Sequence, residues 1–179
     1  MASFSLRPAQ LEDRVGVDTL LACSYPPLLA ASYDPELLAA ALPAMIRASP
    51  TLLECETWFV ALSERGEIVG CGGWTRARPG TGEREPGLGH VRHFGTHVDH
   101  VRRGIARAIA MKMLTTARAA GVTHLECYST LAAERFYASL GFRAREAITI
   151  PIPRLDRPGE FVEFPSVLMR CDLGDSARH

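Results

Sequence analysis

The stretch THVDHVRRGIARA, residues 96–108, decides how the rest of the chain is interpreted. It leaves an apolar run typical of a strand, passes through a short basic turn and enters a segment with helical periodicity. The first turn of a helix has backbone N–H groups without partners and carries partial positive charge. Three arginines surround this turn, and two small residues keep its backbone accessible: Arg102, Arg103, Arg107, Gly104 and Ala106. The stretch predicts an anion site, most simply for a diphosphate; the alternative is a helix start whose arginines face solvent.

Two common phosphate-binding turns are excluded at this position. The stretch lacks the G-x-x-x-x-G-K-[ST] pattern of nucleotide-binding P-loops. It also lacks the G-x-G-x-x-G fingerprint of dinucleotide-binding folds. A nucleotide-like ligand would therefore have to be held by a different kind of helix N-terminus.

The segments before this turn predict a strand, two helices and then three strands. Their expected ranges are 4–7, 11–22, 35–42, 57–62, 67–74 and 88–96. Asp34 is expected to cap the second helix, with Pro35 at its first position. The proline-containing run SYPPLLAASYDP, residues 24–35, is expected to be an irregular connection or part of a substrate wall, and RARPGTGEREPG, residues 76–87, a loop.

The segments after the turn predict helix, strand, helix and two closing strands, over 105–120, 124–128, 132–140, 145–150 and 167–173. Runs of strands mixed with few helices favour an α+β fold, in which helices pack on a mixed sheet. We expect one domain over residues 1–174 and a flexible tail over 175–179. The run PIPRLDRPGEFVEFP, residues 151–165, is expected to be a solvated loop; the alternative is that it shapes the acceptor site, with Asp156, Glu160 and Glu163 facing a cationic amine.

Composition excludes several classes of protein. Of the 179 residues, 47% are hydrophobic and 22% are charged, which is typical of a globular chain. Lys plus Arg and Asp plus Glu both number 20, so a basic surface for nucleic acid is not expected. No apolar run is long enough to span a membrane, and the five scattered cysteines with no secretory start predict free thiols and a cytoplasmic location.

Residues 96–109 resemble the acyl-CoA-binding motif of the GNAT superfamily of N-acetyltransferases. That motif runs V-x-P-x-x-[QR]-x-x-G-x-[GA] between a strand and a helix. Gly104, Ile105 and Ala106 match its end. Val98 and Val101 stand where a proline and a glutamine or arginine are usual.

A second resemblance follows at the expected distance, in STLAAERFYASLGF, residues 129–142. This segment is similar to the later GNAT motif N-x-x-A-x-x-x-Y-x-x-x-G-F. The match has variations: Ser129 stands where asparagine is common, Ala132 keeps its distance from Ser129, and Tyr137, Gly141 and Phe142 keep the Y-x-x-x-G-F spacing one residue further along. The two motifs in this order are more specific than either alone.

The resemblance implies a mostly antiparallel, twisted sheet of about six to seven strands with helices on both faces. It implies acetyl-CoA as cosubstrate and direct transfer of the acetyl group to a primary amine of a small molecule or peptide. It also implies a possible homodimer. Charge and hydropathy, as above, predict no nucleic-acid or membrane partner. The backbone around Thr96, His97 and Val98 would pair with the pantetheine arm. The turn from Arg102 to Arg107 would hold the pyrophosphate, and Tyr137 would protonate the departing thiolate. A non-catalytic CoA-binding regulatory module of the same fold is the alternative.

The general base is the least determined residue. His90 lies on the strand that leads to the basic turn and is our candidate, because imidazole titrates near neutrality. Strand alternation would place His93 on the opposite face, and Glu83 and Glu85 in the preceding loop are other candidates. The spacing of His90, His93, His97 and His100 spreads these rings over a strand and a turn, so no metal site is expected.

Overall fold

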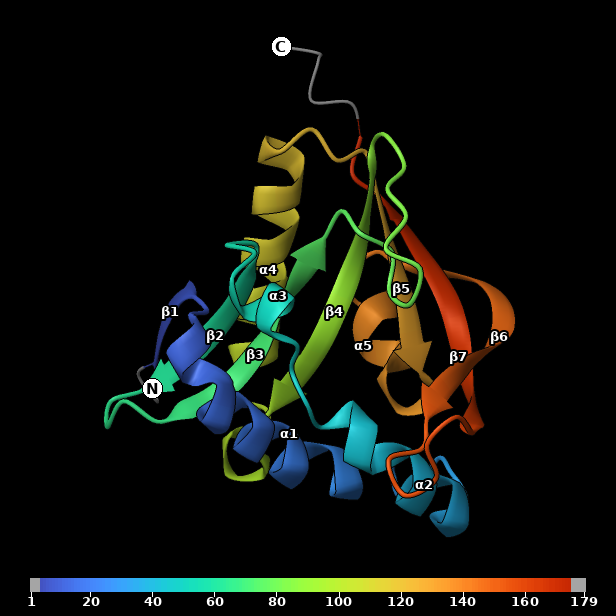
Figure 1. Cartoon of the computed structure of the whole chain (residues 1–179). Helices are drawn as coiled ribbons and strands as arrows, with labels where there is room; N and C mark the ends of the chain where they lie inside the picture. The colour runs from blue at the N-terminus through green and yellow to red at the C-terminus, as the bar shows by residue number, and fades with distance from the viewer. Residues whose placement is uncertain (1–3, 175–179) are drawn as a thin grey trace.

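The computed structural model describes residues 4–174, which form a seven-stranded sheet in the order β1-β2-β3-β4-β5-β7-β6 (Figure 1). The strands are β1 (Phe4–Pro8), β2 (Trp58–Ser63), β3 (Ile68–Thr75), β4 (Leu88–Thr96), β5 (His124–Thr130), β6 (Arg143–Pro153) and β7 (Phe161–Asp172). The helices are α1 (Arg14–Leu29), α2 (Pro35–Met45), α3 (Pro50–Leu53), α4 (Ile105–Ala119) and α5 (Glu134–Ala138). The tail expected over 175–179 lies outside the described residues.

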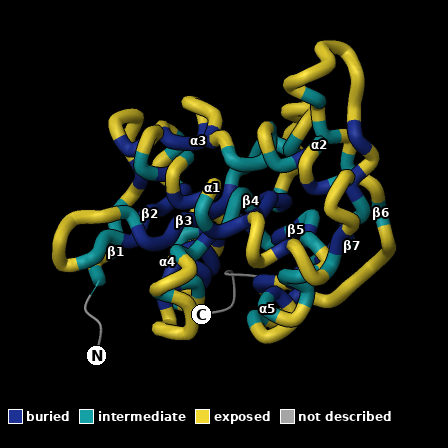
Figure 2. The backbone as a smooth tube through the Cα atoms, turned by 90° about the horizontal axis from the view of Figure 1, so that it is seen from below, coloured by how far each residue is buried: buried dark blue, intermediate teal, exposed yellow. Residues whose placement is uncertain are grey.

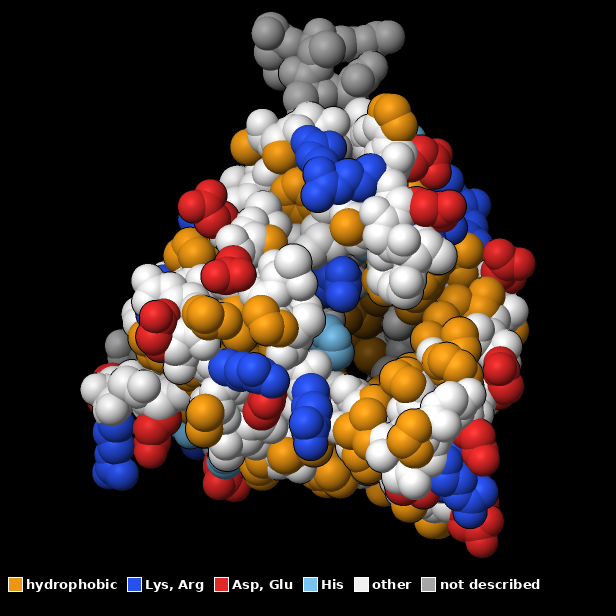
Figure 3. Space-filling view, in the orientation of Figure 1, with side chains coloured by type: hydrophobic (Ala, Val, Ile, Leu, Met, Phe, Trp, Pro, Cys, Tyr) orange, Lys and Arg blue, Asp and Glu red, His pale blue; other side chains and the backbone are white. Residues whose placement is uncertain are grey.

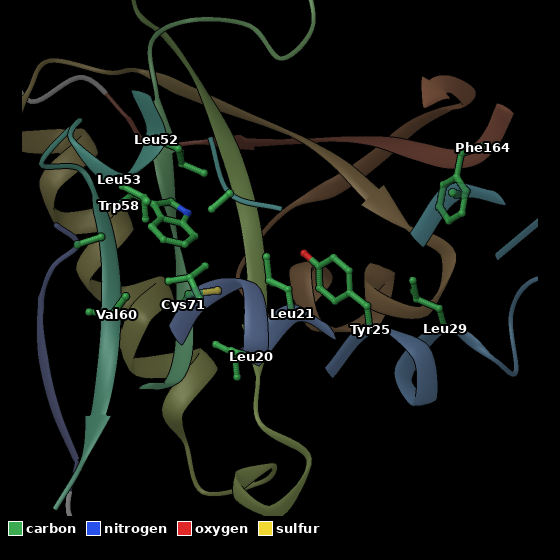
Figure 4. Packing of buried hydrophobic residues seen from close by; sticks show 14 of the residues in the cluster. Leu20, Leu21, Tyr25, Leu29, Leu52, Leu53, Trp58, Val60, Cys71 and Phe164 are labelled. Carbon is green, nitrogen blue, oxygen red and sulfur yellow. The ribbon is translucent and has the colours of Figure 1, made fainter. Parts of the chain in front are cut away.

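Helices cover both faces of this sheet, which confirms the expected α+β architecture. In Figure 1, α1 and α2 lie in front of the sheet, and α4 and α5 lie behind it. The front core packs α1 against the sheet through Leu20, Leu21 and Tyr25, with Trp58 and Cys71 opposite them (Figure 4). A separate set of apolar residues fills the rear, beneath α4 and α5. The central strands are therefore buried on both sides, whereas β6 at the edge is exposed along much of its length (Figure 2).

In the middle of the sheet, β4 and β5 pair over a short length and then separate. β4 and β5 are the parallel pair, and their pairing covers only Leu88 with His124, Gly89 with Leu125 and His90 with Glu126. Every other pairing is antiparallel. Beyond His90 the two strands separate, so each has an inner edge without a neighbouring strand.

A β-bulge interrupts β4 just past this point of separation. Arg92 pairs with Gly73 and Gly95 pairs with Cys71, so three steps along β4 match two steps along β3. An extra residue of this kind bends the strand and breaks the strict alternation of its side chains. His93 lies within the bulge at φ 37°, a backbone conformation uncommon for a residue other than glycine.

Two regions differ from the sequence-based expectation. α1 continues through Pro26 and Pro27 to Leu29, although the prolines predicted an end near residue 22. Tyr25 and Leu29 are buried in the front core. Burying such side chains stabilises by about 1.5–3 kcal/mol each, which offsets the helix hydrogen bonds that the prolines cannot make.

The second difference lies in the last two strands. β6 extends to Pro153 and β7 begins at Phe161, so most of the loop expected over 151–165 is strand. The prolines of β6 are tolerated because it is the edge strand of the sheet. The helix cap was predicted correctly: Oδ1 of Asp34 accepts hydrogen bonds from the N–H groups of Glu36 and Leu37.

Candidate active site

A cleft of about 860 Å³ occupies the gap between β4 and β5. Figure 3 looks into this hollow: hydrophobic side chains gather on its right and lower sides, and basic and histidine side chains lie at its mouth. One end reaches the N-terminus of α4 through Arg102, Gly104 and Arg107. The other end lies between α1, α2, β6 and β7. From the expectation that the resemblance gives, we call the first end the cosubstrate half and the second end the acceptor half.

The cosubstrate half is built mainly from backbone. Gly104 caps α4 at φ 81°, and Arg102 precedes it at φ 61°. No side chain caps the first turn of α4, so its N–H groups remain available to a ligand. Gly104 is required here because the left-handed conformation is costly for residues with a β-carbon. This is the turn for which the sequence predicts an anion site, and its residues line the cleft.

The inner edge of β4 supplies further backbone groups. The N–H of His97 donates to the carbonyl of Val69 on β3, over 2.9 Å. Because successive N–H groups of a strand point to opposite sides, the N–H of Thr96 points away from β3 and toward the gap. Thr96 lines the cleft. The gap can therefore accept an extended chain that bonds to β4 as an added strand would.

Tyr137 lies at the floor of the cleft, on α5. Its ring makes edge contacts with Phe94 and Phe142, with centroids 6.0 and 5.6 Å apart. Its hydroxyl interacts with the thiol of Cys127, which also lines the cleft. Burial raises the pKa of Tyr137 well above its usual value of 10, so the hydroxyl keeps its proton and can donate it.

Most of the residues singled out from the sequence line this cleft. They are Thr96, Val98, Arg102, Gly104, Ile105, Ala106, Arg107 and Tyr137. The side chain of His97 is instead used within its own turn, where Nδ1 accepts from the N–H of Asp99 over 3.2 Å. Arg103 is exposed outside the cleft. Ser129 is buried, and its hydroxyl donates to the carbonyl of Thr130 over 2.8 Å.

The structure does not bring His90 to the cleft. Its side chain is 3% exposed and its Nδ1 lies 3.9 Å from Oε2 of Glu126 on β5. Burial, together with the nearby charges of Arg78 and Arg92, lowers the pKa of His90 to about 4. His90 lies where β4 and β5 still pair, before the gap opens, and this position separates it from a ligand in the cleft. Glu83 and Glu85 likewise lie outside the cleft lining.

His93 lines the cleft instead. Alternation along a regular strand would have placed it on the face opposite His90, but the bulge in β4 breaks that alternation. Burial lowers the pKa of His93 to about 4, with a further lowering by Arg92. The imidazole is therefore neutral at pH 7 and has a lone pair that can accept a proton. Sequence reasoning missed His93 because nothing local in 88–96 signals the bulge.

The acceptor half is built from side chains of four elements that are far apart in the sequence. Tyr25 and Leu29 come from α1, and Figure 4 shows Tyr25 lying between β4 and Phe164. The remaining wall consists of Pro27, Leu28, Ala44, Met45, Ile150, Ile152, Pro153, Phe164 and Ser166. The 24–35 run thus contributes to the wall of the cleft. The acids of the 154–163 segment do not line the cleft, and Asp156 instead pairs with Arg154 at 2.7 Å.

Residues 4–174 show neither a metal site nor a membrane-spanning helix. No group of three or more His, Cys, Asp or Glu side chains is arranged to hold a metal ion there. None of the helices in this range combines the length and the apolar character needed to cross a bilayer. All five cysteines are free thiols, as expected.

The GNAT acetyltransferase family model matches residues 17–142, which include β4, β5, the α4 turn and Tyr137 but not the β6 and β7 residues of the cleft. The chain therefore belongs to the GNAT family of acetyltransferases. A search of curated proteins gives no match.

Solved structures of GNAT proteins share the fold over the whole chain. A GCN5-related N-acetyltransferase from Rhodopseudomonas palustris, also titled a class-II aminotransferase, is 21% identical with a TM-score of 0.74; 96% of this chain and 97% of that chain are covered. PaiA N-acetyltransferase from Thermoplasma acidophilum, solved in complex with coenzyme A, is 12% identical with a TM-score of 0.68, covering 95% and 99%. The ribosomal-protein-S18-alanine N-acetyltransferase from Escherichia coli is 12% identical with a TM-score of 0.62, covering 99% of both chains. At these identities the likeness establishes the fold.

Proposed function

We propose that this protein transfers an acetyl group from acetyl-CoA to a primary amine by direct transfer. The observation that carries the proposal is the gap between β4 and β5, which opens after three paired positions and leads to the uncapped first turn of α4. A thioester arm requires an extended slot, and its diphosphate requires free N–H groups. The cleft supplies both: the open edge of β4 forms the slot, and the first turn of α4 that follows supplies the N–H groups.

The residues of the cosubstrate half fit this ligand. The N–H groups at Gly104, Ile105 and Ala106 would bind the pyrophosphate, with Arg102 and Arg107 adding positive charge. The open edge of β4 up to Thr96 would bond to the pantetheine arm. A structural neighbour, PaiA, was solved with coenzyme A, which supports the same ligand class here.

Acetyl transfer requires a hydrogen-bond donor to the thioester carbonyl oxygen and an acid that protonates the departing thiolate. The N–H of Thr96 would stabilise the negative charge that develops on the carbonyl oxygen. Tyr137 would donate its proton to the thiolate sulfur, because its hydroxyl remains protonated at neutral pH. His93, which replaces His90 as our candidate base, would accept the proton that the amine loses as it attacks.

Direct transfer is favoured over an acetyl-enzyme intermediate. Cys127 is a cysteine lining the cleft, and burial raises its pKa to about 12. A thiol attacks as thiolate, and at pH 7 this group is almost entirely protonated. Cys127 is therefore a poor nucleophile, and the amine itself is left to attack the thioester.

The test is calorimetric titration of the full chain with acetyl-CoA, with ATP and NAD as controls, followed by thiol release in the presence of a panel of primary amines. We expect saturable binding of acetyl-CoA alone and amine-dependent release. Binding without release across the panel would favour a non-catalytic CoA-binding module. Absence of binding would overturn the proposal, and would point to Val98 and Val101 as marks of a lost cosubstrate site.

A further inference from the structure

Arg92 is a cation on β4, where the two halves of the cleft meet, and it forms no ion pair with a carboxylate of residues 4–174. It is one of the residues that line the cleft, and it is partly buried. Its Nη1 donates to the hydroxyl of Thr75 over 3.2 Å. Within residues 4–174, no carboxylate lies within the 4.0 Å of an ion pair with Arg92. Most of the donors of this guanidinium therefore remain available to a ligand.

The surroundings of Arg92 make this arrangement unusual. The described residues that line the cleft include no aspartate or glutamate. The other lining cations, Arg102 and Arg107, lie at the α4 turn in the cosubstrate half. Burial opposes the charge of Arg92 and lowers its pKa, although an arginine stays protonated at any physiological pH. A partly desolvated cation facing an apolar wall is stabilised by an anion delivered with the substrate.

The bulge places this cation next to the candidate base. Arg92 and His93 are consecutive in β4, and both line the cleft. The charge of Arg92 acts on the imidazole of His93, so the two groups are close in space as well as in sequence. An acceptor whose amine approaches His93 would bring a group bonded near that amine to Arg92.

Resting on the proposed function, we propose that the acceptor is an apolar amino acid whose carboxylate is bound by Arg92 while its amine faces His93. Its side chain would lie in the apolar wall formed by α1, α2, β6 and β7, against Leu29, Met45 and Ile152. The planar guanidinium matches a carboxylate through two parallel hydrogen bonds. Polyamines and other polycations are disfavoured, because the lining offers no acid for a second ammonium group.

The experiment compares free amino acids with their carboxamides, which keep the amine and the side chain but lack the negative charge. Thiol release is measured with saturating acetyl-CoA and L-leucine, L-methionine or L-phenylalanine, each against its amide. We expect kcat/KM to favour the acid by about ten- to hundredfold, as a charge-assisted hydrogen-bonded pair would give. Equal values for acid and amide, or a preference for the amide, would overturn the inference while leaving acetyl transfer intact.

Variants assign the discrimination to Arg92. In Arg92→Met the preference for the acid should fall to about twofold or less, and Arg92→Lys should keep part of it. Arg84→Met is the matched control, because Arg84 is exposed in the β3–β4 loop outside the cleft and should keep the full preference. An unchanged preference in Arg92→Met would contradict the assignment. Acetyl-CoA binding by each variant, measured by calorimetry, verifies that the cosubstrate half is intact.

A binding measurement separates this inference from the failure of catalysis. The protein loaded with coenzyme A is titrated with N-acetyl-L-leucine and with N-acetyl-L-leucinamide, which represent the expected products. Tighter binding of the acid by about tenfold, lost in Arg92→Met, would support the carboxylate site even without turnover. Equal affinity, or no binding of either compound together with no turnover of any amino acid, would overturn it.

Discussion

The two halves of the cleft are built in different ways. The cosubstrate half uses the backbone of one continuous segment, from the open edge of β4 through the turn at Gly104 into α4. The acceptor half uses side chains from α1, α2, β6 and β7, which are brought together only by the fold. Arg92 and His93, at the bulge in β4, lie where the two halves meet.

This difference predicts how each half responds to substitution. Backbone donors persist when side chains change, so the cosubstrate half should be lost mainly by inserting charge or altering backbone conformation. Side-chain walls change with each substitution, so the acceptor half can differ widely while the fold stays the same. The proposed proton donor at the junction should show the largest effect, because it would act on the reacting atoms.

The largest effect is expected for Tyr137→Phe, at the junction. This change removes the proton donor but keeps the ring that packs on Phe94 and Phe142. We expect kcat to fall about a hundredfold or more, since general acid catalysis typically contributes that much. Thiol release at saturating substrates measures this loss, with acetyl-CoA affinity and thermal stability as controls. A fall of less than threefold would remove Tyr137 from the mechanism.

The next effect tests the cosubstrate half. Ala106→Glu places a carboxylate in the first turn of α4, where the account places the pyrophosphate. We expect the affinity for acetyl-CoA in calorimetry to fall about a hundredfold, because like charges repel at this turn. Ala106→Gln is the neutral control of similar size and should lose much less. Equal losses in the two variants would show that side-chain bulk, and not charge at the turn, decides binding.

A smaller effect separates the two histidines. His93→Gln should lower kcat about tenfold or more, because His93 lines the cleft and can accept a proton. His90→Gln should change kcat less than threefold, since His90 is buried beside Glu126 and outside the cleft. Steady-state thiol release of both variants decides between them. The reverse order of effects would restore His90 as the base.

The smallest effect is on stability as a function of pH. The pKa values of His90 and His93 are each lowered to about 4 in the folded protein, from 6.5 in an unfolded chain. Between pH 6.5 and 4 the unfolded state binds protons that the native state does not, so stability falls as pH falls through this window. The stability that the two neutral histidines contribute is fully present above pH 6.5. Thermal denaturation of the wild type and His93→Gln should show a shallower fall in the variant; identical slopes would contradict the lowered pKa of His93.

Much of the fold was predictable because its signals are local. The turn at 102–107, the helix behind it and the Asp34 cap each depend on a few neighbouring residues. The end of α1 was not predictable in this way, because burial of Tyr25 and Leu29 against distant strands outweighs the effect of its prolines.

The predictability of the site also depends on whether its residues come from one segment or from several. Most residues predicted for the cosubstrate half line the cleft, since one continuous segment supplies them; their binding role stays a prediction. His93 and Arg92 were missed as cleft residues because the bulge is a matter of register between β3 and β4, which no single segment encodes. The acceptor wall was only suggested, at residues 24–35 and 151–165, because its members are distant from one another in sequence.

Amide hydrogen exchange of the full chain, with and without acetyl-CoA, tests most directly that the two halves bind different ligands. The account predicts that acetyl-CoA alone protects β4 beyond His90 and the turn from Arg102 to Arg107. The α2 helix and the β6–β7 hairpin should exchange as before. Protection confined to α2 and the hairpin, or no protection at the α4 turn despite saturating acetyl-CoA, would contradict the account.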